Sequence, residues 1–195
     1  MTVFRWINGW SFAWENLFVF FSEATKQNPV RIGLLVIVVA LIAAGPTTRK
    51  AALLSLLSIL LANSFADGFK YAVHMLRPCN ELLDVTMHVG KLNSYGTASS
   101  HAANMAALAF VMLYYFKWWG LPWVAVAILT GLARIYVGVH YPSQVLFGYG
   151  LGLLCAFVAV KTFELWKGRR EEGAANPIQR PTERIAGPAD IRKDK

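Results

Sequence analysis

The stretch that decides the fold is residues 135–160, IYVGVHYPSQVLFGYGLGLLCAFVAV, which contain no Asp, Glu, Lys or Arg. Four further stretches lack these residue types: residues 32–48, 51–66, 92–116 and 118–133. A helix needs roughly 20 apolar residues to cross a bilayer core, and about 17 suffice. Helices of a water-soluble protein would carry a polar stripe, which these stretches do not have. Because 56% of all residues are hydrophobic and only 15% are charged, we predict an all-α, polytopic membrane helix bundle.

Five transmembrane helices fit these uncharged stretches. We place them at about residues 30–45, 49–76, 99–117, 121–137 and 142–163. Gly45-Pro46 and Gly120-Leu121-Pro122 are turn signals, and they predict compact connections between antiparallel neighbours. Residues 78–98, which are rich in polar residues and glycine, form the one substantial loop.

The first 28 residues combine many aromatic side chains with Arg5, Glu15, Glu23 and Lys26. This mixture is typical of an amphipathic helix that lies among lipid headgroups. A short sixth span at about residues 11–25 is the alternative. We therefore expect three parts in the chain: an interfacial segment at 1–28, a transmembrane domain at 29–165 and a flexible, charged tail at 166–195.

The net charge of +8 does not indicate a nucleic-acid-binding protein, because nine of the 19 Lys and Arg residues lie from Lys161 onward. A nucleic-acid surface needs a basic face on a folded domain. Arg49, Lys50 and Lys117 lie in short loops that fall on the same side of the predicted bundle as the tail. The positive-inside rule makes that side cytoplasmic, so the 78–98 loop faces outward. The short chain, its compact loops and the absence of a eukaryotic-type targeting signal favour a multi-pass protein of a bacterial inner membrane.

Polar side chains gather at the outward ends of these predicted spans. They come from four different helices: Lys70, Arg77, Ser99, Ser100, His101, Arg134 and His140. Lys70 and Arg77 are seven residues apart and share one helix face. Between His101 and His140 there are enough residues for one helix across the membrane and one back, so the two histidines return to the same side.

This group of side chains suits a phosphate. Three cations at one place would repel one another unless an anion lay among them, and guanidinium groups bind phosphate oxygens in pairs. Backbone N–H groups at the helix start near Ser99 point at the same anion. One neutral histidine can attack phosphorus while the other protonates the leaving oxygen, so this chemistry needs no metal. Cys79 and Cys155 show no metal-type spacing.

Three motifs carry a family resemblance. They read Lys70-Tyr-Ala-Val-His-Met-Leu-Arg77-Pro78, Ala98-Ser99-Ser100-His101 and Ala133-Arg134-x5-His140-x3-Gln144. In order and spacing they resemble the K-x6-RP, PSGH and SR-x5-H-x3-D motifs of the type 2 phosphatidic acid phosphatase and vanadium haloperoxidase superfamily. The resemblance covers roughly residues 70–150. It implies a membrane enzyme that dephosphorylates lipid phosphates or pyrophosphates without a metal or another cofactor.

The resemblance also implies roles for single residues. His140 would be the nucleophile that becomes phosphohistidine, and His101 would be the general acid. The phosphate would be held by Lys70, Arg77, Ser99, Ser100 and Arg134. Gln144 stands where the family usually has Asp, and its amide oxygen can accept a hydrogen bond from Nδ1–H of His140 and fix the tautomer. A neutral amide cannot balance an imidazolium charge, so we expect a lower rate.

Expectations for three neighbouring residues follow from their positions. Asp67 precedes Lys70 by three residues, so we expect an i, i+3 ion pair between them. His74 faces away from the motif residues and is expected to make packing or loop contacts. His88 lies in the polar loop and is expected to be solvated.

The implied substrate is a lipid phosphate that reaches the site sideways from the phospholipid bilayer. Candidates are undecaprenyl pyrophosphate, phosphatidylglycerophosphate, phosphatidic acid and lipid A phosphates. Two alternatives use the same pocket. A phosphotransferase would pass the phosphoryl group to a lipid hydroxyl, and a non-catalytic protein would bind or transport a lipid phosphate, for which Gln144 is the one hint. The oligomeric state has no signature in the sequence.

Overall fold

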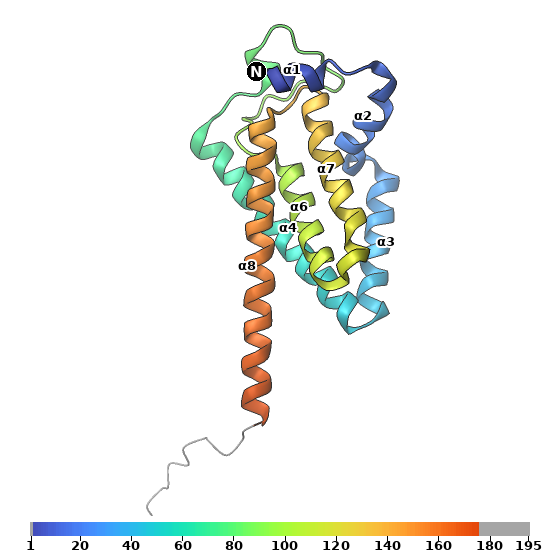
Figure 1. Ribbon diagram of the computed structural model, residues 1–195, viewed down its shortest axis with the longest axis vertical. Helices are drawn as coiled ribbons and strands as arrows, with labels where there is room; N and C mark the ends of the chain where they lie inside the picture. Colours follow the sequence, from blue (N-terminus) through green and yellow to red (C-terminus); the bar gives the residue numbers. More distant parts are fainter. Residues whose placement is uncertain (1, 176–195) are drawn as a thin grey trace, which may run out of the picture. The chain divides into compact units, whose positions relative to one another are not determined.

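The computed structural model describes residues 2–175, and the regular elements in this range are all helical (Figure 1). In chain order they are α1 (Thr2–Asn8), η1 (Phe12–Trp14), α2 (Glu15–Glu23), η2 (Ala24–Lys26), α3 (Asn28–Ala44), α4 (Pro46–Val73), α5 (Pro78–Glu81), α6 (Ser100–Phe116), η3 (Lys117–Gly120), α7 (Leu121–Tyr136) and α8 (Pro142–Ala175). The predicted all-α fold is confirmed.

The long helices begin where the sequence placed them, for local reasons. Proline occupies the first turn of α4 and of α7, where its missing N–H costs nothing. Ser99 caps α6, since its hydroxyl accepts from the amide of Ala102 at 3.4 Å. Gly120 is required at the turn into α7, because a Cβ there would lie 2.5 Å from Cα of Leu113.

Helix α6 lies in the middle of the bundle. Helices α4 and α7 pack against it, α3 packs against α4, and α2 packs against α7 (Figure 1). The interfaces are built from small residues: Ala62 and Ala66 of α4 are fully buried. A Cβ on Gly152 of α8 would lie 2.1 Å from the carbonyl oxygen of Ala103 in α6. Small residues let helix backbones approach closely, as is typical of packing between membrane helices.

Large apolar side chains lie on the outside of these helices. α3 buries none of its residues, and Leu60 of α4 and Leu154 of α8 are mostly exposed. By length and composition, three helical stretches of the described chain can cross a membrane: Pro46–Glu81, Ser100–Tyr136 and Pro142–Gly173. Residues Phe12–Lys26 with Asn28–Ala44, bent by 66°, would make a fourth. The count of five individual spans stays a prediction.

The N-terminal segment is docked on the end of α7 that leads to His140. Phe4 and Phe18 join a buried cluster with Tyr136, and the rings of Phe18 and Tyr136 are 4.8 Å apart. The side-chain Nδ2 of Asn8 donates to the backbone carbonyl oxygens of Thr86 and Tyr136, at 2.8 and 2.7 Å. Segment 2–26 is therefore part of the packed structure, and its position among lipid headgroups stays a prediction.

The chain divides into two compact units, Met1–Lys161 and Thr162–Lys195. The first unit contains every residue of the candidate site. The tail predicted from residue 166 begins inside α8, which continues to Ala175. The rest of that predicted tail, residues 176–195, lies outside the described residues.

Candidate active site

His140 lies in the short turn between α7 and α8, and 2% of it is exposed. Its backbone amide donates to the carbonyl oxygen of Arg134 at 3.1 Å, which folds the turn back onto the end of α7. Gly138 allows this turn, because its φ of +84° is a conformation that other residues rarely adopt. The histidine ring is thereby presented from a turn with a defined backbone.

The amide of Gln144 fixes the tautomer of His140. Its Nε2 donates to the carbonyl oxygen of Leu76 at 2.8 Å, and its Oε1 accepts from the backbone amide of Tyr141 at 3.1 Å. Oε1 is therefore an acceptor, so Nδ1 of His140, 3.1 Å away, carries the hydrogen. The lone pair of the ring then lies on Nε2, the nitrogen that a nucleophilic histidine uses.

Arg77 occupies the space in front of that lone pair. Its Nη1 lies 2.8 Å from Nε2 of His140 and donates to the carbonyl oxygen of Val139 at 3.1 Å. Its Nε and Nη2 donate to oxygens of Ser94 and Tyr95, at 2.6 to 3.1 Å. Gly96 makes room for this packing, because a Cβ there would lie 2.8 Å from Cγ of Arg77. The guanidinium group is thus held at the nucleophile by the 78–98 loop.

Lys70 and Ser100 lie together at the start of α6. Nζ of Lys70 contacts Oγ of Ser100 at 2.5 Å and Oδ1 of Asp67 at 2.8 Å. The expected Asp67–Lys70 ion pair is confirmed. Asp67 also accepts from the side chain of Asn63 at 3.1 Å, which restrains the carboxylate. The serine that replaces the usual glycine is therefore accommodated by a hydrogen bond to the site lysine.

Ser99 joins α6, which carries His101, to α8, which begins just after His140. Its backbone amide donates to the backbone carbonyl oxygen of Gln144 at 3.1 Å, so the starts of α6 and α8 are tied together. Its amide is consequently used within the protein, and the serine is fully buried. Only its hydroxyl hydrogen is left to donate to an anion, while its oxygen caps the helix.

Hydrogen bonds join the three motifs to one another. Arg77 contacts His140, and Ser99 donates to the backbone oxygen of Gln144. Lys70 contacts Ser100, which precedes the half-buried His101 in the first turn of α6. The motif residues therefore converge at one end of the bundle, as their places at the ends of four helices predicted.

Arg134 is held by residues that we did not predict. Its Nη1 donates to Oγ and the backbone oxygen of Ser22, at 2.7 and 3.3 Å, and to Oε1 of Glu23 at 3.3 Å. Both partners belong to α2, which we expected to lie among the headgroups. Glu23 and Lys26 had no motif to mark them, and the packing of α2 on α7 brings them here.

Two other histidines flank the site. The expectation that His88 is solvated is wrong: its side chain is 2% exposed, donates from Nδ1 to Oε1 of Glu15 at 3.0 Å and stacks on Tyr136. His74 makes the expected loop contact, with its ring edge on Tyr95 at 4.4 Å. Neither ring is among the groups that surround Nε2 of His140.

Burial lowers the pKa of His140 well below its ordinary value of 6.5, and the charges of Arg77 and Arg134 lower it further. The ring is therefore neutral, as a nucleophile must be. Because the unfolded chain binds this proton more readily, the free energy of unfolding falls as the pH drops below 6.5. The neighbouring Tyr141 keeps its proton, since burial and the Glu81 hydrogen bond raise its pKa to about 12.

We predict that His140 stays neutral in mildly acidic solution. Nitrogen NMR of histidine-labelled protein in detergent should show, at pH 5.5, a signal from the His140 ring with Nδ1 protonated and Nε2 bare. That signal should be absent from the His140→Asn variant. If the signal that is lost in this variant titrated near pH 6.5 in the wild-type protein, the assignment would be contradicted.

Comparisons with known proteins found a matching family model and several similar proteins. A family model described as the PAP2 superfamily matches residues 51–167. Undecaprenyl-diphosphatase of Sulfolobus acidocaldarius is 30% identical over 125 residues, which are 64% of this chain and 61% of that protein, so the chain spans about three fifths of this curated relative. The structure of LpxE from Aquifex aeolicus is similar with a TM-score of 0.71 and 25% identity, covering 82% of this chain and 93% of that one. A PAP2-type phosphatidylglycerolphosphate phosphatase from Bacillus subtilis shares the fold, with a TM-score of 0.64 and 20% identity over 84% of this chain and 85% of that one.

Proposed function

Since the chain belongs to the PAP2 superfamily, we propose that it is a membrane phosphatase that hydrolyses a lipid phosphate or diphosphate through a phosphohistidine at His140. One observation carries the proposal: the buried ring of His140 is hydrogen-bonded through Nδ1 to Gln144, and its Nε2 lies 2.8 Å from Nη1 of Arg77. A neutral nitrogen nucleophile among cations is suited to attack on a phosphate, since the cations stabilise the charge that develops on its oxygens.

The first step transfers the phosphoryl group to the protein. Nε2 of His140 attacks phosphorus, and a P–N bond forms while the P–O bond to the lipid alcohol breaks. Nη1 of Arg77 must then move from Nε2 to a phosphate oxygen, where it is joined by Lys70 and Arg134. His101, in its protonated form, gives its proton to the leaving oxygen.

The second step returns the enzyme to its starting state. Neutral His101 takes a proton from water, the water oxygen attacks phosphorus, and the P–N bond breaks to release inorganic phosphate. Gln144 keeps the ring in place through both steps by its bond to Nδ1. Because an amide carries no charge, the cationic phosphohistidine is less stabilised than beside the usual Asp, so we expect the phosphoenzyme to be short-lived and the rate modest.

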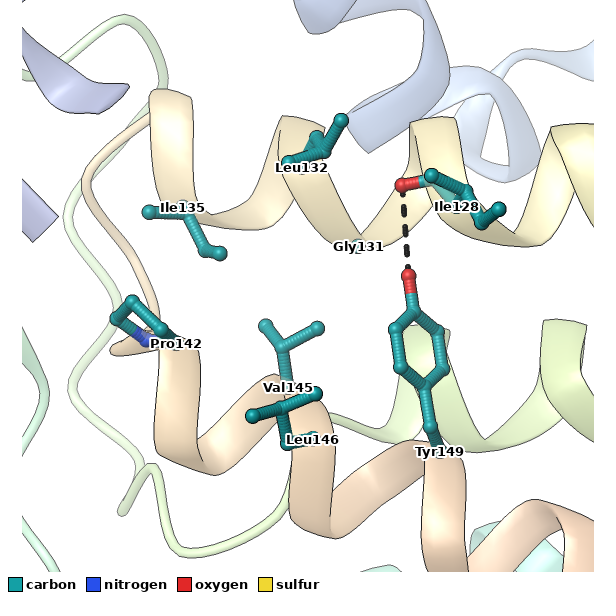
Figure 2. Close-up of a pocket in the computed structure, with 8 residues that line it drawn as sticks. All are labelled: Ile128, Gly131, Leu132, Ile135, Pro142, Val145, Leu146 and Tyr149. Carbon is teal, nitrogen blue, oxygen red and sulfur yellow. Dashed lines mark hydrogen bonds between the residues drawn. The ribbon is translucent and has the colours of Figure 1, made fainter. Parts of the chain in front are cut away.

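An apolar groove beside the site favours a lipid substrate. Figure 2 shows it between α7 and α8, with a volume of about 170 Å³. Its lining is wholly apolar: Ile128, Gly131, Leu132, Ile135, Pro142, Val145, Leu146 and the ring of Tyr149. The hydroxyl of Tyr149 reaches across to α7, where it donates to the carbonyl oxygen of Ala127 at 2.7 Å. The groove starts two residues from His140, so a hydrocarbon chain in it would place its phosphate near the nucleophile.

We predict that filling this groove selectively weakens the binding of long-chain substrates. Leu146 is 66% exposed, so the Leu146→Trp variant should fold and should occupy the groove. KM for a long-chain lipid phosphate should rise about tenfold, the cost of losing roughly two buried CH₂ groups. Hydrolysis of p-nitrophenyl phosphate, which has no chain, should stay within about twofold.

The matched control is Leu154→Trp, on the same helix two turns further along and similarly exposed. Leu154 lies outside the groove, so this variant should hydrolyse both substrates as the wild type does. Equal effects of the two variants on the lipid substrate would show that the groove does not hold the chain.

The function itself is tested by a substrate panel in detergent. Purified protein should release inorganic phosphate from undecaprenyl pyrophosphate, phosphatidylglycerophosphate, phosphatidic acid or a lipid A phosphate. EDTA should not reduce the rate, because in the proposed mechanism cationic side chains stabilise the phosphate charge in place of a metal. Transfer of phosphate to an added lipid alcohol, with little inorganic phosphate, would favour a phosphotransferase. Lipid binding without turnover would favour a non-catalytic protein.

We place the protein in a bacterial inner membrane with this site facing outward. The support is the charge distribution: Arg49, Lys50 and Lys117 lie at the end of the bundle opposite His140. A cysteine reporter at Ser143, beside the site, should react with an impermeant maleimide added to intact cells.

A further inference from the structure

Helix α2 brings a carboxylate into contact with Arg134 from outside the region that matches the family. The match begins at residue 51, whereas Glu23 ends α2 and lies 3.3 Å from Nη1 of Arg134. Arg134 is 3% exposed, so whatever contacts its guanidinium group determines how that group is oriented.

The hydrogen bonds of Arg134 are one-sided. All three go from Nη1 to Ser22 and Glu23. Its Nε is buried and has no hydrogen-bond partner among the described residues. A buried N–H without a partner costs about 1–3 kcal/mol, so it calls for a ligand. The Nε edge of a guanidinium group is one of the two that bind phosphate oxygens in pairs.

Glu23 has two further partners besides Arg134. Its Oε2 forms an ion pair with Lys26, and its Oε1 accepts from the hydroxyl of Ser22 at 3.4 Å. The helix that carries it is anchored by Phe18, which packs on Tyr136. Because Lys26 already balances the charge of Glu23, the carboxylate adds little net repulsion toward a phosphate. Its main effect on Arg134 is therefore geometric.

We propose that Glu23 is a positioning residue, which holds Nη1 of Arg134 so that the Nε edge faces the phosphate of the substrate. This inference rests on the proposed phosphatase function. It assigns segment 2–26 a part in phosphate recognition, in addition to any contact with lipid headgroups. The alternative is that Glu23 competes with phosphate for Arg134, and the two ideas predict opposite changes in affinity.

Phosphate binding tests the proposal without requiring turnover. Inorganic phosphate and orthovanadate should raise the Tm of the full-length protein, and the concentration dependence gives Kd. In the Glu23→Ala variant we expect Kd to rise about tenfold, the loss of roughly one charge-assisted hydrogen bond. Glu23→Gln keeps an acceptor for Nη1 and should stay within about threefold. Glu15→Gln, on the same helix but paired with His88, is the matched control and should equal the wild type.

A double-mutant cycle separates positioning from a general loss of structure. In an Arg134→Ala background, Glu23→Ala should have no further effect on Kd or on KM of a lipid phosphate. Tighter phosphate binding by Glu23→Ala, or effects of the two changes that simply add, would overturn the proposal. If wild-type protein binds phosphate but turns over no lipid, the phosphatase function fails while the assignment of Glu23 is still decided by Kd.

Discussion

Replacing His140 with alanine is expected to reduce kcat/KM for a lipid phosphate by roughly 10⁴-fold or more, as loss of a catalytic nucleophile does. The variant has no nitrogen at the position of Nε2, so no P–N bond can form. Rapid quenching of wild-type protein with radiolabelled substrate should trap an acid-labile, base-stable phosphoprotein. The variant should yield none.

The ring of His140 also contacts Arg77 and Gln144, so alanine removes two buried hydrogen bonds and can lower stability. His140→Asn keeps a polar group there and serves as the second variant, with Tm measured for both. His74→Asn is the matched control, since His74 has φ of +54°, which asparagine tolerates, and should keep wild-type activity. Wild-type turnover by a folded His140→Asn protein would end the phosphohistidine mechanism.

Patterns of spacing were enough to predict the helices and the converging motifs. Uncharged stretches long enough to cross a bilayer predicted the positions of α3, α4, α6, α7 and α8. The i, i+3 spacing gave the Asp67–Lys70 pair, and the one-turn spacing of His140 and Gln144 gave their hydrogen bond. These relations are local, so the geometry of a single helix or turn determines them.

The contacts that orient the site arise between segments far apart in the chain. Ser22 and Glu23 reach Arg134 across more than a hundred residues, and the carbonyl oxygen of Leu76 reaches Gln144 across sixty-eight. A backbone oxygen has no sequence signal, and a glutamate in an amphipathic segment looks like a solvated residue. His88 was misjudged for the same reason, because burial under Phe12 and against Tyr136 depends on how the N-terminal segment docks.

Loss of the general acid, His101, is expected to have the second large effect on the rate of hydrolysis. The size of this effect depends on the leaving group of the substrate. His101→Ala should slow hydrolysis of an alkyl lipid phosphate by about 10²–10⁴-fold, because an alkoxide leaves poorly without a proton. With p-nitrophenyl phosphate the first step should be nearly unchanged, since nitrophenolate is stable as an anion. The second step still needs His101 to deprotonate water. We therefore expect a burst of one nitrophenolate per protein, followed by slow turnover and accumulation of phosphohistidine.

This burst distinguishes an acid from a phosphate ligand. If His101 only bound phosphate, its loss would reduce the hydrolysis of both substrates equally, and no phosphoenzyme would accumulate. Ser100→Ala supplies that comparison, because its hydroxyl contacts Lys70 and carries no transferable proton in the mechanism. The Ser100→Ala variant should lose similar fractions of its activity toward the lipid and toward p-nitrophenyl phosphate, and it should show no burst. A His101→Ala protein that behaves as Ser100→Ala does would remove His101 from proton transfer and leave it as a ligand of the phosphate held by Arg134 and Lys70.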